Sequence, residues 1–122
     1  MKLNVLVVRY QKIAEVVSEG IVINETQDAL DLMADAVDHG ARRLILYEKN
    51  LKPDFFSLRT KVAGDILQKF AQYHMKLAVI GQFEKYNSKS LNALIDESNR
   101  GELAFFVPDK ETAIARLIGY QE

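Results

Sequence analysis

The stretch NLKPDFFSLRTKVAGDILQKFAQYHM, residues 50–75, decides the fold. Its apolar residues recur at spacings of three and four, on one face of a helix: Val62, Ala63, Ile66, Leu67, Phe70 and Ala71. The pattern predicts an amphipathic helix, the longest in the chain, with one buried side. Pro53 and Asp54 suit its first turn, because proline has no N–H to leave unsatisfied and a helix start favours negative charge. Gly64 costs about 1 kcal/mol relative to alanine inside a helix, so we expect another backbone to pass close to it.

Short apolar runs and helical patterns alternate along the rest of the chain. Runs typical of strands lie at residues 3–9, 12–17, 21–23, 44–47, 76–80 and 103–107. Helical patterns lie from about Thr26 to His39, around residues 91–95 and after Asp109. Strands that alternate with helices predict an α/β fold with a mainly parallel sheet. We therefore expect one domain over residues 1–122, with a mixed sheet of about five strands, an antiparallel N-terminal edge and four helices.

Capping residues predict where the helices begin and end. Asn24 or Thr26 is expected to cap the first helix, and Gly40 to end it in the left-handed region. Asn87 or Ser88 is a candidate cap for the third helix, and Asp109 for the fourth. The segment 97–101 is interpreted as a structural helix end with a left-handed residue.

Composition excludes several classes of function. Lys and Arg number 16 against 17 Asp and Glu, the net charge is −1, and no basic stripe is visible, so no nucleic-acid partner is expected. The chain has no cysteine, and His39 and His74 lack the spacing of metal ligands, so we expect neither a metal nor another cofactor. No apolar run approaches the roughly 20 residues that span a bilayer. A cytoplasmic protein that does not interact with membranes is the default expectation.

The candidate site lies at the carboxyl ends of the parallel strands, where ligands bind to sheets of this kind. One group of polar residues surrounds the start of the long helix: Glu48, Asn50, Asp54, Ser57, Arg59 and Thr60. A second group follows the next strand: Lys85, Tyr86 and Ser88. We expect both groups to meet at one edge and to bind a protein partner or a small anion, with Ser57 and Thr60 as candidate phosphorylation sites.

A structural interpretation of the same residues stays open. Ser57 and Thr60 would then bond to nearby backbone, Arg59 would pair with Asp54 or Glu48, and Ser88 would only cap a helix beside solvated lysines. The loop at residues 81–90 lacks the glycines of a P-loop or of a dinucleotide-binding fingerprint. No nucleophile and base stand at a recognisable spacing, and no catalytic residue is predicted.

Three segments carry a family resemblance that covers nearly the whole chain. DALDLM (residues 28–33), NLKPDFFSLRT with AGDILQKF (within residues 50–70) and YNSKSLNALIDESNRG (residues 86–101) resemble a bacterial domain of unknown function, family 4180. The usual pattern of that family has a glycine where this chain has Lys61. The family has no assigned activity, so the resemblance implies a fold and no function.

A looser resemblance is to the STAS domain of anti-sigma factor antagonists. There too a strand-rich start leads into alternating helices and strands, and a regulatory serine begins the helix after a central strand. By order of elements that position falls near Ser57 or Thr60, although the Asp-Ser motif of phosphorylated STAS domains is not present in that form. This resemblance implies a STAS-like fold.

Three functional hypotheses follow. The leading one is a small cytoplasmic STAS-like regulatory or interaction module that binds a protein partner or small anion at the start of the long helix. The second is an enzyme of unknown reaction, with a pocket at the same edge that uses Glu48, Asp54 or Arg59. The third is a structural homo-oligomer, in which two copies pair through an apolar helix face or an edge strand.

Overall fold

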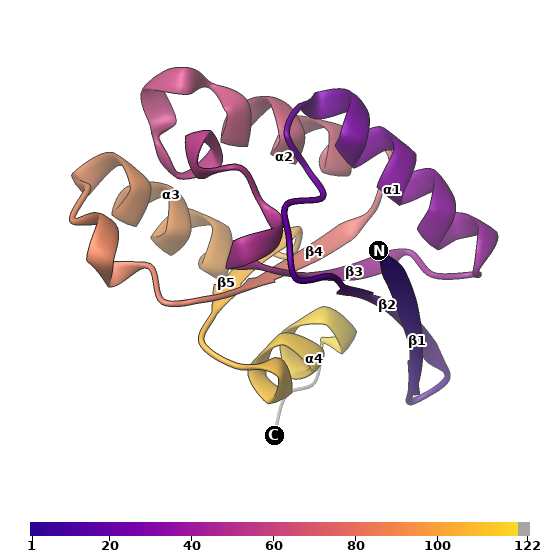
Figure 1. Cartoon of the computed structure of the whole chain (residues 1–122). Helices are drawn as coiled ribbons and strands as arrows, with labels where there is room; N and C mark the ends of the chain where they lie inside the picture. Colours follow the sequence, from indigo (N-terminus) through magenta and orange to yellow (C-terminus); the bar gives the residue numbers. More distant parts are fainter. Residues whose placement is uncertain (120–122) are drawn as a thin grey trace.

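A computed structural model describes residues 1–119 and shows a five-stranded sheet in the order β1-β2-β3-β4-β5 (Figure 1). The strands are β1 (Lys2–Val8), β2 (Gln11–Val17), β3 (Arg43–Tyr47), β4 (Lys76–Ile80) and β5 (Ala104–Val107). β1 pairs antiparallel with β2, and every later pair is parallel. The predicted mixed sheet with an antiparallel N-terminal edge and four helices is confirmed. The last three residues of the predicted domain, 120–122, lie outside the described residues.

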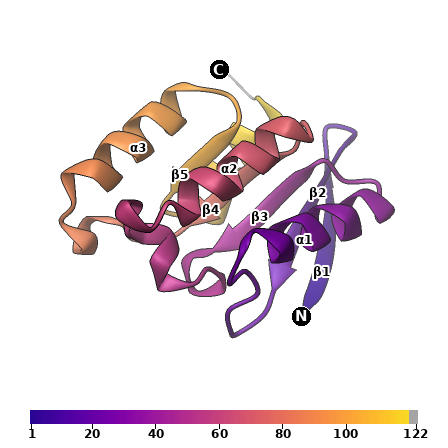
Figure 2. The same ribbon diagram turned by 90° about the horizontal axis from the view of Figure 1, so that it is seen from above.

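Three helices cover one face of the sheet and the fourth covers the other (Figures 1 and 2). α1 (Thr26–Asp38), α2 (Val62–Gln72) and α3 (Lys89–Arg100) each connect one parallel strand to the next, whereas α4 (Lys110–Ile118) follows β5. Right-handed crossovers that all step in the same direction place their helices on the same face. Within residues 1–119 the strand order never reverses, so the sheet has no switch point at which a deep crevice would open.

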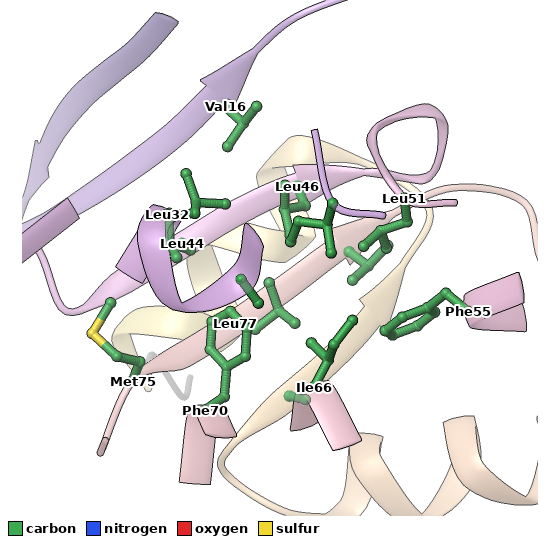
Figure 3. Packing of buried hydrophobic residues seen from close by; sticks show 14 of the residues in the cluster. Val16, Leu32, Leu44, Leu46, Leu51, Phe55, Ile66, Phe70, Met75 and Leu77 are labelled. Carbon is green, nitrogen blue, oxygen red and sulfur yellow. The ribbon is translucent and has the colours of Figure 1, made fainter. Parts of the chain in front are cut away.

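Alternate residues of the central strands supply two hydrophobic cores. Leu44, Leu46 and Leu77 face α1, α2 and α3 (Figure 3). Ile45 and Ala78 belong to the second core, beneath α4. This arrangement explains why β3 and β4 read as unbroken apolar runs, since both faces of a strand between two helical layers are buried.

The predicted start of the long helix at Pro53, and its rank as the longest helix, are both wrong. Short 3₁₀ turns at Glu48–Asn50, Pro53–Phe56 and Leu58–Thr60 precede α2, which begins at Val62. α2 has 11 residues and is shorter than α1, which has 13. The helical spacing holds only from Val62 onward, while the buried rings of Phe55 and Phe56 turn the preceding segment into the core. Pro53 does occupy a first turn, but of a 3₁₀ helix.

Other local predictions differ in their outcome. Residues 21–23 are not a strand, because Ile23 forms only an isolated bridge with Leu51. Glu25, and neither Asn24 nor Thr26, is the N-cap of α1. Gly40 ends α1 with φ +81°, as predicted. The hydroxyl of Ser88 and the carboxylate of Asp109 accept capping hydrogen bonds at 3.2 and 2.7 Å, which confirms both caps.

The predictions for Gly64 and for the segment 97–101 are both wrong in detail. A Cβ on Gly64 would meet nothing within 4 Å, so the predicted close backbone approach there is wrong. Gly101 has φ −93° and is not left-handed. The Asn99 side chain instead bonds to the backbone N–H and C=O of Phe106, at 2.8 and 3.1 Å, and so occupies polar groups on the free side of β5.

Lys61 has a left-handed backbone, with φ 65°, immediately before α2. A side chain in this region costs about 1 kcal/mol or more, whereas glycine adopts it without strain. This gives a physical reason for the glycine that the resemblance described above implies at this position. We expect Lys61→Gly to raise the free energy of unfolding in urea by about 0.5 kcal/mol, because the greater freedom of the unfolded chain offsets part of the gain.

The matched control is Lys69→Gly, inside α2. There the backbone is helical, so glycine should lower the free energy of unfolding by about 1 kcal/mol. Equal losses in the two variants would show that no strain is relieved at position 61.

Candidate functional site

The two groups of polar residues predicted to meet do lie side by side. Glu48 accepts a hydrogen bond from the Tyr86 hydroxyl, and its carboxylate lies 2.7 Å from the Lys85 ammonium. The N–H of Gln82 also donates to Glu48, at 3.3 Å. The rings of Phe56 and Tyr86 stack with centroids 4.9 Å apart. The loop after β3 and the loop after β4 therefore form one continuous surface at the carboxyl ends of the strands.

The Glu48 carboxylate is charged and already partnered. Burial acts to raise its pKa, but the hydrogen bonds from Lys85, Tyr86 and the Gln82 backbone outweigh burial, and the pKa lies below its ordinary value. Burial and the hydrogen bond to Glu48 together hold the pKa of the Tyr86 hydroxyl well above its ordinary value. Lys85 is thus neutralised by Glu48, and Glu48 is not held protonated as a general acid.

Asn50 is fully buried, and its side chain bonds to backbone groups of two separate segments. Its amide donates to the carbonyl oxygens of Ser18 and Gly20, at 3.0 and 2.9 Å. Its side-chain oxygen accepts from the N–H of Tyr47 at 3.0 Å. Asn50 therefore connects the loop after β2 to the end of β3. Its side-chain amide is not accessible to solvent.

Asp54 and Thr60 also have partners of their own. The Asp54 carboxylate lies 3.7 Å from the Lys52 ammonium. The Thr60 hydroxyl lies 2.6 and 2.7 Å from the carbonyl oxygens of Asp54 and Ser57, and it accepts from the N–H of Val62. The predicted alternative of local backbone bonding is thus confirmed for Thr60. The alternative pairing of Arg59 with Asp54 or Glu48 is not found among residues 1–119.

A pocket of about 370 Å³ lies between the turn at Leu58–Thr60 and the start of α3. Its walls come from both loops: Phe56, Ser57, Leu58, Arg59, Tyr86, Ser88 and Ser90. Arg59 is exposed here and, within residues 1–119, has neither a hydrogen bond nor an ion pair. The first N–H groups of α3 have no partner within the helix, and Ser88 caps only that of Leu91. The pocket therefore combines an available guanidinium with a helix N-terminus.

A second hollow of about 330 Å³ lies beside the first and shares Phe56 and Tyr86 with it. It is lined further by Ile21, Glu48, Lys49, Leu51, Pro53 and Lys85. The predicted residues therefore do not form one site. Glu48 and Lys85 line this hollow, Ser57, Arg59 and Ser88 line the pocket at α3, and Tyr86 lines both. Asn50, Asp54 and Thr60 line neither.

The sequence reasoning missed a polar network on the α4 side of the sheet. The Glu15 side chain, only 8% exposed, accepts hydrogen bonds from the Tyr47 hydroxyl at 2.6 Å and from Lys110 at 2.9 Å. A third bond comes from Asn4 at 3.3 Å. Burial acts to raise the pKa of Glu15, but these bonds outweigh burial and lower it, while burial and Glu15 raise the pKa of Tyr47 to about 12. A glutamate inside the apolar run KIAEVV was the signal that could have revealed the network.

The two histidines lie away from the pocket. His39 and His74 come shortly after the last residues of α1 and α2. Both therefore lie at the amino ends of the parallel strands, whereas the pocket lies at the carboxyl ends. Among residues 1–119 no cluster of three or more His, Cys, Asp or Glu side chains could hold a metal ion. No helix within the same residues has the length and apolar content needed to cross a membrane.

The fold and the surface at its carboxyl edge define a small α/β domain with a shallow polar pocket. The chain belongs to the family described as Domain of unknown function (DUF4180), whose model matches residues 8–117. Searches of curated proteins and of solved structures each gave no match. The resemblance to STAS domains therefore stays a prediction based on the order of elements.

Proposed function

We propose that this domain is a binding module that holds an anionic group, a phosphate or a carboxylate, in the pocket between Arg59 and the start of α3. The anion would be carried by a small molecule or by a protein partner. A regulatory role in the cytoplasm is part of this proposal. It retains the leading sequence hypothesis but moves the site from the start of α2 to the start of α3.

The observation that carries the proposal is the distribution of charge among the cations of this edge. Lys85 is paired with Glu48, and Lys52 with Asp54. Arg59, in contrast, is exposed beside the pocket without a carboxylate partner among residues 1–119. A guanidinium presents several N–H groups in a fixed plane, which suits bidentate binding of carboxylate or phosphate oxygens.

The other walls of the pocket support the same chemistry. The free N–H groups and the dipole at the start of α3 favour an anion. The Ser57 and Ser90 hydroxyls can donate to its oxygens, and the Phe56 and Tyr86 rings supply an apolar side. Ser57 also remains the better candidate for phosphorylation, because the Thr60 hydroxyl is already bonded to the backbone. A phosphoryl group on Ser57 would place its charge at the same pocket.

The test is a titration of the ¹⁵N-labelled protein with inorganic phosphate, followed by NMR. We expect the amide signals of Lys89 and Ser90 to shift on binding. Arg59→Ala should weaken binding about tenfold or more, since a hydrogen bond to a charged group contributes about 1.5–3 kcal/mol. Arg59→Lys should retain part of the affinity, because the charge stays but the planar fork is lost.

Arg100→Ala is the matched control, because Arg100 is the last residue of α3, at the far end from the pocket. It should leave phosphate binding unchanged. Unchanged binding in Arg59→Ala would remove Arg59 from the site and refute the proposal.

The enzyme hypothesis gains no comparable support from these residues. A carboxylate that acts as a general acid near neutral pH needs a raised pKa. The pKa of Glu48 lies below its ordinary value instead.

A further inference from the structure

The outer side of β1 is an open edge of the sheet. β1 has β2 on one side, and within residues 1–119 no strand pairs with its other side. Figures 1 and 2 show the β1–β2 hairpin at the margin of the sheet, with no described strand beyond it. The polar backbone groups along this edge therefore have no partner strand in a single copy of the chain.

The hairpin turn determines which backbone groups point outward. The loop has two residues, Arg9 and Tyr10, both with positive φ, 51° and 67°, as in a type I′ turn. In such a hairpin the flanking pair, here Val8 and Gln11, exchanges hydrogen bonds, and bonded pairs then alternate along the strands. The even-numbered residues of β1 thus bond to β2. The N–H and C=O groups of Leu3, Val5 and Val7 face outward.

This edge lacks the features that normally prevent strand pairing. Proteins protect open edges with charged side chains, prolines or bulges. Residues 3–8 of β1, LNVLVV, contain no charge and no proline, and the register with β2 runs without a bulge from Lys2 to Val8. The Val7 side chain is 64% exposed. β1 is therefore an edge without a bulge, mainly apolar, that can accept another strand.

We propose that β1 pairs antiparallel with β1 of a second copy, about a two-fold axis at Val5. In this register Leu3 of one copy lies opposite Val7 of the other, and Val5 lies opposite Val5. All three residues with outward-facing backbone groups then occupy hydrogen-bonded positions in both copies. The two sheets would join into one continuous sheet.

Self-complementarity favours a second copy over an unrelated strand as the occupant. A two-fold interface needs the same surface to match itself, and the sequence Leu3, Val5, Val7 is apolar when read in either direction. The Lys2 ammonium groups, the only charges within β1, would lie at opposite ends of the paired strands. Within β1, residues 2–8, opposing residues therefore bring no like charges together.

The same pairing would extend the hydrophobic core across the axis. Leu3 packs against the core beneath α1, α2 and α3. Val5 and Val7 point to the same face, because side chains alternate along a strand. Pairing would cover the exposed Val7 side chain with Leu3 of the other copy. The interface lies away from α3, so the proposed anion pocket stays open (Figure 1).

Sedimentation equilibrium tests the pairing directly. We expect the wild-type chain to reach twice its mass of 13.9 kDa as its concentration rises. Val5→Lys would place two lysines opposite each other on the axis and should give a monomer. Val7→Lys would place a charge opposite the apolar Leu3 of the other copy and should also give a monomer. Because the Val7 side chain is 64% exposed in a single copy, the circular dichroism spectrum should stay that of the wild type.

The control is Val37→Lys, at a valine of α1 that is 42% exposed. Val37 lines an apolar groove of about 560 Å³ between the ends of α1 and α2, which is a second apolar surface on which two copies could meet. The Val37 variant should remain dimeric. A dimer that dissociates on changing Val37 but not Val7 would overturn the proposal.

Hydrogen exchange supplies a second readout. In the dimer the amides of Leu3, Val5 and Val7 should exchange slowly, and Val7→Lys should return them to fast exchange. The amides of Asn4 and Leu6 should be protected in both variants, because they bond to β2. A wild-type chain that stays monomeric up to millimolar concentration, or a dimer with fast exchange at Leu3, Val5 and Val7, would refute pairing through β1.

Discussion

Asn50→Ala should lower the free energy of unfolding by about 3 kcal/mol. The substitution removes two side-chain bonds to the carbonyl oxygens of Ser18 and Gly20 and one from the N–H of Tyr47. Each buried group that loses its partner costs about 1–3 kcal/mol, and part of this cost is relieved where water can enter. The loss should be measured as a shift of the urea midpoint at unchanged slope.

Asn92→Ala is the matched control, because Asn92 is exposed on α3. It should be neutral or slightly stabilising, since alanine is the better helix former. Asn50→Asp should be at least as damaging as Asn50→Ala, because a carboxylate cannot donate to the two carbonyl oxygens and its charge would be buried. A change below about 1 kcal/mol in Asn50→Ala would contradict the role assigned to this side chain.

Gly81→Ala should cost about 2 kcal/mol and disturb the pairing of Glu48 with Tyr86. A Cβ at position 81 would lie 2.7 Å from Glu48 Oε1 and 2.8 Å from Glu48 Cβ. The carboxylate could swing aside, but the Cβ can move only with its backbone, so overpacking of this kind costs typically 1–3 kcal/mol. The measurable result, beside lower stability, is a fall in the pKa of the Tyr86 hydroxyl as its bond to Glu48 lengthens.

Gly64→Ala provides a control of opposite sign. A Cβ there would meet nothing within 4 Å, and the position lies inside α2. Alanine should therefore stabilise the protein by about 1 kcal/mol. If both alanine variants stabilised the protein, the close approach of Glu48 to Gly81 would be disproved.

The layers of this fold could be predicted from the sequence, because a strand buried on both faces has a continuous apolar sequence. Runs such as LILY (residues 44–47) and LAVI (residues 77–80) are apolar at every position only where helices cover both faces of a strand. Capping chemistry was equally legible at Ser88 and Asp109, since short polar side chains compete for free N–H groups at helix starts. The break before α2 could not be predicted, because Lys61 is not a residue that normally signals a left-handed backbone.

The candidate site was predictable in position but not in its internal pairing. The carboxyl ends of neighbouring parallel strands lie close together, which places the loop that begins at Glu48 beside the loop that follows β4. The choice between Lys85 and Arg59 as the partner of Glu48 depends on where each side chain leaves its loop. Glu15 was missed because its three partners come from β1, β3 and the start of α4, far apart in the chain.

The unreversed strand order has a consequence for how tightly anything can be held at this edge. Because its connecting helices all lie on one side, the sheet forms a shallow binding surface at the carboxyl ends of its strands, and much of a bound ion would stay in contact with water. Water competes for every hydrogen bond made there, so free phosphate should bind only weakly, and selectivity must come from the molecule to which the anion is attached. The domain is thus suited to recognising a charged group that belongs to a larger molecule, whose other parts make contacts outside the pocket.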